Sequence, residues 1–214
     1  MCKILAVQFL DNADPALCKK LGTQRRCLGF LTADSDDVTY IALDEATKAA
    51  EVEVVYGASF YAGAANATTP YAGEVLGVLA GDSPGAVRAG MAAAVAVAEG
   101  LSFTEVAGVP YLAYTVSSCG SFLAKEAGAP VGSALAYLIA PPLESMVALD
   151  GALKAADVAL CKLYEPPSPT NFGGGLLTGS RSACEAACRE FARIVAEIAQ
   201  KPCHCEGRQT RGSQ

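Results

Sequence analysis

The sequence predicts an α+β protein of two tandem domains, each an antiparallel sheet with flanking helices. One observation is an internal repeat: ALDEATKAAEV from Ala42 recurs as ALDGALKAADV from Ala148, with eight of eleven positions identical. Another is that strand-like and helix-like segments follow in the same order in both copies. An offset of 106 residues indicates a duplicated domain, because the units of a solenoid are about 20–50 residues long.

Each copy predicts a strand, a short helix, a second strand, the repeated helix, two more strands and a final helix. In copy one, Asp14-Pro15 marks the short helix, since Asp caps a helix and Pro suits its first turn. Leu43 and Ala46 share the apolar face of the repeated helix. This order favours a sheet with its helices on one face. Strands are expected at 3–10, 27–33, 52–56, 74–80, 110–117, 133–140, 158–164 and 175–178, and final helices from Pro84 and Ser182.

The repeat also predicts the domain boundaries. LGFLTADSDDVTYIALD lies over ALAYLIAPPLESMVALD at the same offset of 106 without a gap, and after the repeated helix the offset falls to 98. We therefore expect a first domain at residues 1–105, a second at 106–201, and a disordered tail at 202–214. The loops 57–73 and 165–175, rich in Gly, Pro, Asn and Thr, differ most between the copies and are the natural places for function.

Composition excludes several classes of protein. Hydrophobic residues make up 52% and charged residues 18% of the 214, with a mean hydropathy of +0.31, so a disordered chain is excluded and a large buried surface is expected. The longest apolar run, 91–98, is too short to span a membrane, which takes about 20 residues. The N-terminus predicts no export signal. A net charge of −6 without a basic stripe argues against a nucleic-acid partner.

The nine cysteines are predicted to be reduced, because their number is odd and no secretion signal precedes them. Cys184 and Cys188 fall on the apolar stripe of the last helix, so we interpret them as core residues rather than as thiol ligands. Cys203-His204-Cys205 has thiols and an imidazole, but a structural zinc site needs four ligands at wider spacing. We expect no metal site and no cofactor.

An enzyme is not expected. His204, the only histidine, stands in the terminal tail, where no Ser-His or Cys-His pair is held in place. Asp34-Ser35-Asp36-Asp37 superficially resembles the start of a phosphatase motif, but the duplication does not fit that fold. The glycines of GGLLTGS, from Gly174, are spaced like a phosphate loop, yet Ser180 replaces the lysine that would clamp the phosphate.

Several longer motifs resemble one family, the tandem-domain shell proteins of bacterial microcompartments, of the ethanolamine-utilisation type. The motifs are TADSDDVTYIALDEATKAAEVEVVYGASFYAGAANA (32–67), AYLIAPPLE (136–144), ALDGALKAADV (148–158) and SPTNFGGGLLTGSRSACEAAC (168–188), and the resemblance runs from about residue 26 to 200. It implies two circularly permuted bacterial microcompartment (BMC) domains per chain. It also implies a flat pseudohexagonal homotrimer, which tiles with other shell proteins into a compartment in the bacterial cytoplasm.

The resemblance further implies two kinds of opening. Loops 57–73 and 165–175 of three chains would surround a gated central pore, with Tyr61, Asn171 and Phe172 lining it. A small pore at the junction of the two domains would bind a small metabolite such as ethanolamine. The residues carried over to that second site are Asp36, Phe103, Glu144 and Thr170.

The chemistry of these residues suits an amino alcohol, because carboxylates bind an ammonium group and a hydroxyl binds an alcohol. Asp36 has an alternative explanation, since DSDD before an apolar helix is also a helix-cap signal. A second interpretation of the whole chain is a small-molecule sensor of paired α+β domains that binds its metabolite at the junction and does not form layers. Lateral assembly separates a tile from a sensor.

Overall fold

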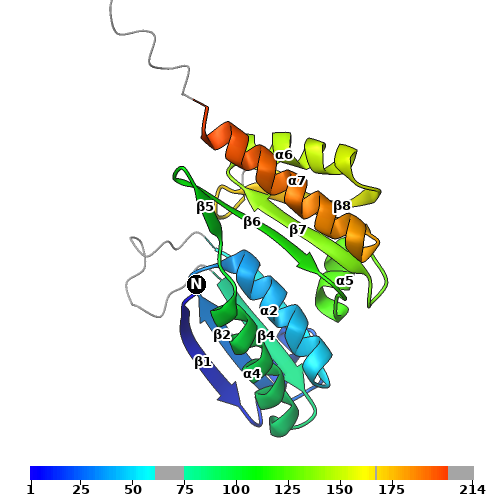
Figure 1. Ribbon diagram of the computed structural model, residues 1–214. Coiled ribbons are helices and arrows are strands. Elements are labelled where there is room, and N and C mark those ends of the chain that lie inside the picture. The colour runs from blue at the N-terminus through cyan, green and yellow to red at the C-terminus, as the bar shows by residue number, and fades with distance from the viewer. Residues whose placement is uncertain (61–74, 167, 202–214) are drawn as a thin grey trace, which may run out of the picture.

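The structure is a computed structural model that describes residues 1–60, 75–166 and 168–201, and it contains two similar halves (Figure 1). Among these residues, each half contains a sheet and three helices. The first half contains β1 (Ile4–Leu10), α1 (Pro15–Lys20), β2 (Cys27–Ala33), α2 (Asp36–Ala49), β3 (Val52–Ser59), β4 (Val75–Gly81) and α4 (Pro84–Gly100). The second contains β5 (Thr104–Val106), β6 (Val109–Val116), α5 (Ser121–Ala127), β7 (Ala134–Ala140), α6 (Pro142–Ala155), β8 (Val158–Tyr164), β9 (Gly173–Gly179) and α7 (Arg181–Ala199).

Both sheets are antiparallel, and they share one order of four strands, to which the second sheet adds β5 at its edge. The strand order is β1-β2-β4-β3 in the first half and β5-β6-β7-β9-β8 in the second. Cys27 of β2 pairs with Gly81, and Ala134 of β7 pairs with Gly179. The second strands of the two copies are therefore offset by 107 residues, so the expected gap-free alignment is wrong by one residue here. The offset of 106 returns at α2 and α6 because the turn before α6 is shorter.

The helices begin where local capping predicts. The Asp14 side chain accepts a hydrogen bond from the backbone N–H of Ala16, with Pro15 in the first turn of α1. Ser83 and Ser180 accept in the same way at the starts of α4 and α7. The final helix of the second copy thus starts at Arg181, one residue before the predicted Ser182, because Ser180 is its cap.

Helices cover both faces of each sheet, which differs from the expected single face. Residues 134, 136, 138 and 140 of β7 pack in one cluster with α6 and α7. Leu135, Tyr137 and Ile139 point the other way and pack with α5. In the first half, Leu28 likewise packs with Cys18 of α1, while Leu31 packs with α2 and α4. The short helices α1 and α5 are therefore the second layer.

The small residues of α4 allow it to lie close to its neighbours in the same chain. A Cβ at Gly90 would stand 3.0 Å from Val52 Cγ2 and 3.6 Å from Ala46 Cβ. Both neighbours belong to the first half. Close packing of α4 against α2 and β3 is the reason that this helix is built almost wholly of Ala, Gly and Val.

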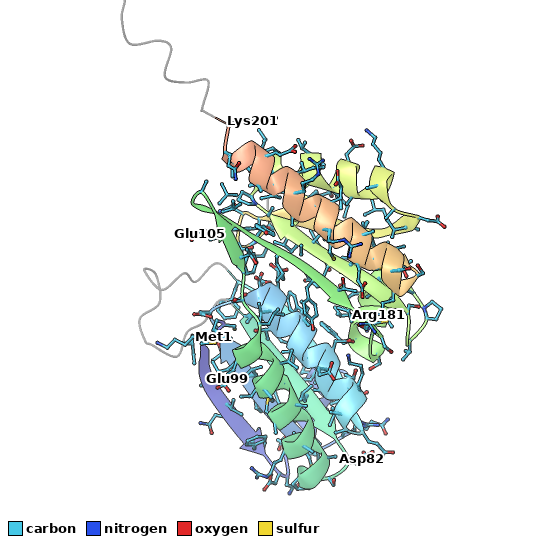
Figure 2. All side chains as sticks on the ribbon, in the orientation of Figure 1. Met1, Asp82, Glu99, Glu105, Arg181 and Lys201 are labelled. Atoms are coloured by element: carbon cyan, nitrogen blue, oxygen red, sulfur yellow. The ribbon has the colours of Figure 1, made fainter. Side chains whose placement is uncertain are left out.

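The two halves meet through α2, which packs against α5 of the second half. Ile41 of α2 is buried in the cluster that Leu123 and Val116 form in the second half. The chain itself crosses between the halves after α4: Glu99 lies near the end of that helix and Glu105 in β5, at the edge of the other sheet (Figure 2). The face of the second sheet that carries α5 is thus covered by α2 of the first half as well.

The structure tests the prediction that two cysteines of the last helix are core residues, and it shows whether a described helix could span a membrane. Cys184 and Cys188 are buried in the cluster of α7, and both thiols are free, so their interpretation as core residues is confirmed. The Cys203-His204-Cys205 tail and most of loop 57–73 lie outside the described residues. Within the described ranges, no helix is both long and apolar enough to cross a bilayer.

Candidate ligand pocket at the domain junction

A pocket of about 200 Å³ lies between the two halves of the chain. The first half contributes the start of α2 and residues of β3, and the second half contributes α5, β7, β8 and residues 168–170 and 172. The pocket exists because α2 leans against α5 at the domain junction rather than against its own sheet alone. Its residues come from segments more than 100 positions apart, so only the tertiary fold assembles it.

Two neighbouring carboxyl groups form one wall. Asp36 and Asp37 are the first two residues of α2, after the N-cap residue Ser35, and both are buried. Asp36 Oδ1 accepts a hydrogen bond of 2.9 Å from the backbone N–H of Asp37. The helix-cap explanation of Asp36 is therefore partly right, but the same carboxyl also lines the pocket. The Asp36 carboxyl also shares a side-chain hydrogen bond with the adjacent carboxyl of Asp37.

Asp37 lies deeper and is tied to the second half. The hydroxyl of Tyr137 donates a hydrogen bond of 2.9 Å to Asp37 Oδ1. Burial, and then the adjacent charge of Asp36, raise the pKa of Asp37 well above its usual range. Burial, and then the charge of Asp37, likewise raise the pKa of Tyr137. This pair fixes the orientation of the carboxyl and joins α2 to β7.

The opposite wall has one ion pair and a ring. Lys162 of β8 pairs with Glu126 of α5, and its ammonium lies 5.3 Å from the centre of the Tyr164 ring. The cation at this wall is thus already partnered.

Tyr40 of α2 shares a short hydrogen bond with Ser59 of β3, and burial raises the pKa of Tyr40 to about 12, so it stays neutral.

A turn in the loop between β8 and β9 forms the rim of the pocket. Asn171 donates its backbone N–H to the Ser168 carbonyl over 3.1 Å, and Ser168 Oγ donates to the Phe172 carbonyl over 2.7 Å. Asn171 has a φ of +60°, a left-handed conformation that Asn tolerates better than most residues. The turn places Thr170 and Phe172 on the pocket wall.

The structure brings some of the predicted residues together and separates others. Asp36 and Thr170 line the pocket, and Phe103 touches it through Phe172, with the two ring centres 5.8 Å apart in an edge-to-face arrangement. Phe172, predicted at a central pore, is half-buried in this same wall. The structure places Asn171 next to it, exposed. Tyr61 lies outside the described residues.

Glu144 does not line this pocket in the part of the chain that the structure describes. It is half-buried in the first turn of α6. Its neighbour Ser145 packs against Gly173, where a Cβ would stand 2.7 Å from the Ser145 hydroxyl. Glu144 is therefore near the end of the rim loop but not at the pocket, and its role as a ligand stays a prediction.

Sequence reasoning missed most of the polar residues of the pocket, among them Asp37, Tyr137, Glu126 and Lys162. Asp37 stood in the same motif as Asp36 and could have been included for its carboxyl group alone. Tyr137 could have been found by the alternation of its strand, which turns it away from the helices α6 and α7. Glu126 and Lys162 carried no local signal, because each is an ordinary charged residue until the fold pairs them.

The arrangement suits recognition of a small cation. A buried carboxyl on the wall, a hydroxyl on the rim and aromatic rings around them can hold an ammonium group and a short polar chain. The described residues hold no cluster of three or more Cys, His, Asp or Glu placed for a metal ion. Acid–base chemistry has no obvious pair here, since Asp37 is held by Tyr137 and Glu126 by Lys162.

Comparison with known proteins places this fold in a family. The BMC domain family matches residues 27–110, which begin with β2 and leave β1 outside, as a circular permutation produces. The bacterial microcompartment shell protein EutL of Clostridium perfringens is 54% identical over 205 residues, covering 93% of this chain and 94% of that protein. EutL of Escherichia coli is 51% identical and covers 89% of both chains.

A solved structure of a relative has the same three-dimensional fold as this chain. The crystal structure of the ethanolamine utilization protein EutL from Leptotrichia buccalis has a TM-score of 0.90 and 55% sequence identity, and the match covers 94% of this chain and 95% of that one. The predicted fold, two tandem permuted BMC domains, is thereby confirmed. The predicted role as a structural shell protein is supported over the sensor interpretation.

Proposed function

The chain belongs to the EutL family of bacterial microcompartment shell proteins, and we propose that three copies of it form one flat tile of such a shell. The duplicated fold supports this proposal, because three chains of two similar domains supply six similar units around one axis. Each tile then lies in the shell beside other shell proteins, in the interior of a bacterial cell. Its task is structural, and catalysis is not part of the proposal.

We propose a central opening bounded by the two loops that differ most between the copies. Tyr61, Asn171 and Phe172 remain the proposed lining of this opening, and passage of metabolites through it is its proposed role. Asn171 is exposed, and its left-handed φ of +60° permits a tight turn at the tip of its loop. Phe172 links that loop to the junction pocket, because its ring forms part of the pocket wall.

The junction pocket is proposed as the binding site of a small cationic amino alcohol such as ethanolamine. The single observation that carries this proposal is the buried carboxyl of Asp36, which lines the cavity beside the second buried carboxyl, that of Asp37. The Thr170 hydroxyl on the rim is the proposed partner of the alcohol, and Phe103 supports the rim through Phe172. The volume of about 200 Å³ leaves space for a ligand of this size.

Affinity is expected to be low because the ligand is small. Even the best small ligands gain no more than about 1.5 kcal/mol per non-hydrogen atom, which sets a dissociation constant no tighter than roughly tens of micromolar for ethanolamine. The ammonium group should provide most of the selectivity, since a buried carboxylate without its cation is costly. Ethylene glycol, which has a hydroxyl in place of the ammonium, is the matched neutral ligand.

The test is a titration of the whole chain followed by calorimetry or by NMR shifts. Wild type is expected to bind ethanolamine at least tenfold more tightly than ethylene glycol. Asp36→Asn keeps an oxygen for the Asp37 N–H but loses the charge, so it should lose this preference, whereas Asp157→Asn on the surface should keep it. Equal binding of both ligands by wild type would refute the site.

Glu144→Ala belongs in the same titration, because the family resemblance makes Glu144 a proposed ligand although it is not at the pocket. Unchanged affinity would remove Glu144 from the site. The shell role has its own measurement: light scattering should give three times the chain mass of 21.8 kDa, and electron microscopy should show hexagonal layers. A single chain that never forms layers would contradict the tile.

A further inference from the structure

Aromatic residues line much of the junction pocket. They come from α2, α5, β7, β8 and the loop before β9, and they are Tyr40, Phe122, Tyr137, Tyr164 and Phe172. We call these five residues the ring set. A carboxylate and a hydroxyl are sufficient to bind the two polar groups of ethanolamine. The ring set is therefore a feature of the pocket that binding of ethanolamine alone leaves unexplained.

Contacts between rings hold most of the ring set in place. The ring centres of Tyr40 and Phe122 lie 6.0 Å apart, and this contact joins α2 to α5 where the two halves meet (Figure 1). The ring centres of Tyr137 and Tyr164 are also 6.0 Å apart, in a stacked arrangement that joins β7 to β8. Both distances lie in the range that aromatic pairs prefer. The walls of the pocket are thus formed before any ligand enters.

One cation of the protein itself already lies against the ring set. The ammonium of Lys162 is 5.3 Å from the centre of the Tyr164 ring, within the roughly 6 Å over which an aromatic ring attracts a cation. Lys162 is paired with Glu126, so these two charges cancel. In the described part of the chain, neither Asp36 nor Asp37 forms an ion pair. The pocket therefore combines aromatic rings with an acidic pair, an environment typical of sites for quaternary ammonium ions.

The cavity is larger than ethanolamine requires. An apolar cavity of about 150 Å³ is sufficient for benzene, which has six carbon atoms. By the same standard, the volume of about 200 Å³ at the junction has room for about eight non-hydrogen atoms. Ethanolamine has four, and choline, its N-trimethylated form, has seven. Methyl groups on the nitrogen would fill space that ethanolamine leaves to water, and they would contact the rings.

The hydrogen-bonding groups of the pocket favour the same class of ligand. A primary ammonium brings three N–H donors, each of which needs an acceptor or a water molecule, whereas a trimethylammonium brings none. Several acceptors of the pocket already have a donor: Asp36 accepts from the Asp37 N–H, Asp37 from Tyr137, and Glu126 from Lys162. A quaternary ion avoids the cost of burying N–H donors without partners and still brings its charge to the acidic pair.

We propose that the junction pocket prefers N-methylated amino alcohols, with choline as the model ligand, over ethanolamine. This inference rests on the proposed binding function of the pocket and names the class of cation that it takes. In this arrangement the charged nitrogen lies among the ring set, beside the acidic pair of Asp36 and Asp37, and the hydroxyl is directed to Thr170 on the rim. Affinity increases with each methyl group that is added to the nitrogen.

The test is a calorimetric titration of the full chain at neutral pH. The ligands are ethanolamine, N,N-dimethylethanolamine, choline and 3,3-dimethyl-1-butanol, which has the shape of choline with carbon in place of the charged nitrogen. Choline is expected to bind about tenfold more tightly than ethanolamine, with the dimethylated amine between them. It is also expected to bind about tenfold or more tightly than the neutral alcohol, which separates the effect of charge from that of size.

Two variants each remove one ring and keep an apolar side chain. Phe122→Leu and Tyr164→Leu should each reduce the preference for choline over ethanolamine to about threefold or less. Phe9→Leu is the control and should keep the preference, since the Phe9 ring packs under the guanidinium of Arg88, 4.5 Å away, and not at the pocket. Circular dichroism checks that each variant is folded, and the two ring variants lie on different elements, so one can fail without loss of the test. An unchanged preference in the folded ring variants would overturn the role of the rings.

Ethanolamine that binds as tightly as choline, or more tightly, would overturn this inference and leave the proposed amino-alcohol site in place. Equal binding of choline and the neutral alcohol would also overturn it, because size alone would then explain the affinity. Absence of binding by every one of these ligands would instead overturn the proposed binding function together with this inference.

Discussion

Replacing Asp44 with alanine should destabilise the junction of the two halves. Asp44 is buried on α2, and its two carboxylate oxygens accept from the backbone N–H groups of Gly120 and Leu123 at the start of α5. Both N–H groups lie in the buried part of the junction, so the truncation leaves two donors without a partner. Asp44 is thus the cap of a helix that belongs to the other half.

The expected cost is about 2–4 kcal/mol. Each buried donor that loses its partner costs about 1–3 kcal/mol. The variant regains part of this free energy, because it no longer buries a carboxylate. Burial raises the pKa of Asp44, so its charged form is less favourable in the folded protein than in water. A cost in that range corresponds to a roughly 30- to 900-fold change in the unfolding equilibrium.

The repeat supplies a matched control. Asp150 occupies the same position on α6, but it is exposed, and in the described part of the chain its carboxylate bonds only to the exposed Lys154, over 2.6 Å. Asp150→Ala should cost no more than about 0.5 kcal/mol. Urea unfolding of both variants at one protein concentration gives the free energies, since assembly makes stability depend on concentration. Hydrogen exchange of the peptide 118–127 gives the local effect, and it should accelerate in Asp44→Ala alone.

Equal costs for the two variants, or unchanged exchange in the peptide of α5, would show that the cap is not what holds the halves together.

Three further predictions concern the junction and the core. Gly120→Ala would place a Cβ 2.6 Å from the Asp44 carbonyl and should cost more than about 2 kcal/mol in thermal unfolding, whereas Gly100→Ala, with nothing within 4 Å, should be neutral or slightly stabilising. The raised pKa of Asp37 means that its contribution to stability is complete below the unfolded pKa of 3.8 and is lost as the pH rises through the folded pKa. Asp37→Asn should therefore gain stability over wild type with rising pH, by up to about 1.4 kcal/mol per pH unit, and a pH-independent difference would contradict the raised pKa. Burial raises the pKa of Cys188 to about 11, so its thiol should react with an alkylating reagent only after denaturation, as mass spectrometry of its peptide can measure; rapid labelling of the native protein would contradict its place in the core.

Most elements were predictable because their signals are local. Asp14-Pro15 starts α1, Cys27–Ala33 is a strand at its predicted bounds, and the final helix of the first copy starts at Pro84 as expected. Where bounds differ, pairing with another strand decided them. β3 continues to Ser59, beyond the predicted end at residue 56, since Ser59 still pairs with Val75.

The glycines of the second loop show how local reading fails. The prediction placed Gly173 and Gly174 in a loop because glycine is typical of irregular backbone. In the structure they begin β9, and a Cβ at Gly174 would stand 1.8 Å from the Leu138 carbonyl. Close approach to β7 is the reason for glycine here, and only the packed sheet reveals it.

The pocket was predictable only in part. Asp36 and Thr170 were predicted from the family resemblance, and both line the cavity. Tyr137 was not, since its hydroxyl meets Asp37 across 100 positions of sequence. Lys162 and Glu126 were missed for the same reason: their pairing exists only after β8 and α5 are in place.

The sequence alone determined that this protein has two copies of one fold, because a repeat and a periodic pattern are written in consecutive residues. Only the tertiary structure shows which surface of each copy is covered by the rest of the chain. α2 and α6 have nearly the same repeated segment, yet α2 is covered by the second half while α6 faces solvent. The reason is physical: periodicity states which side of a helix is apolar, whereas long-range packing decides which surface reaches that side to bury it.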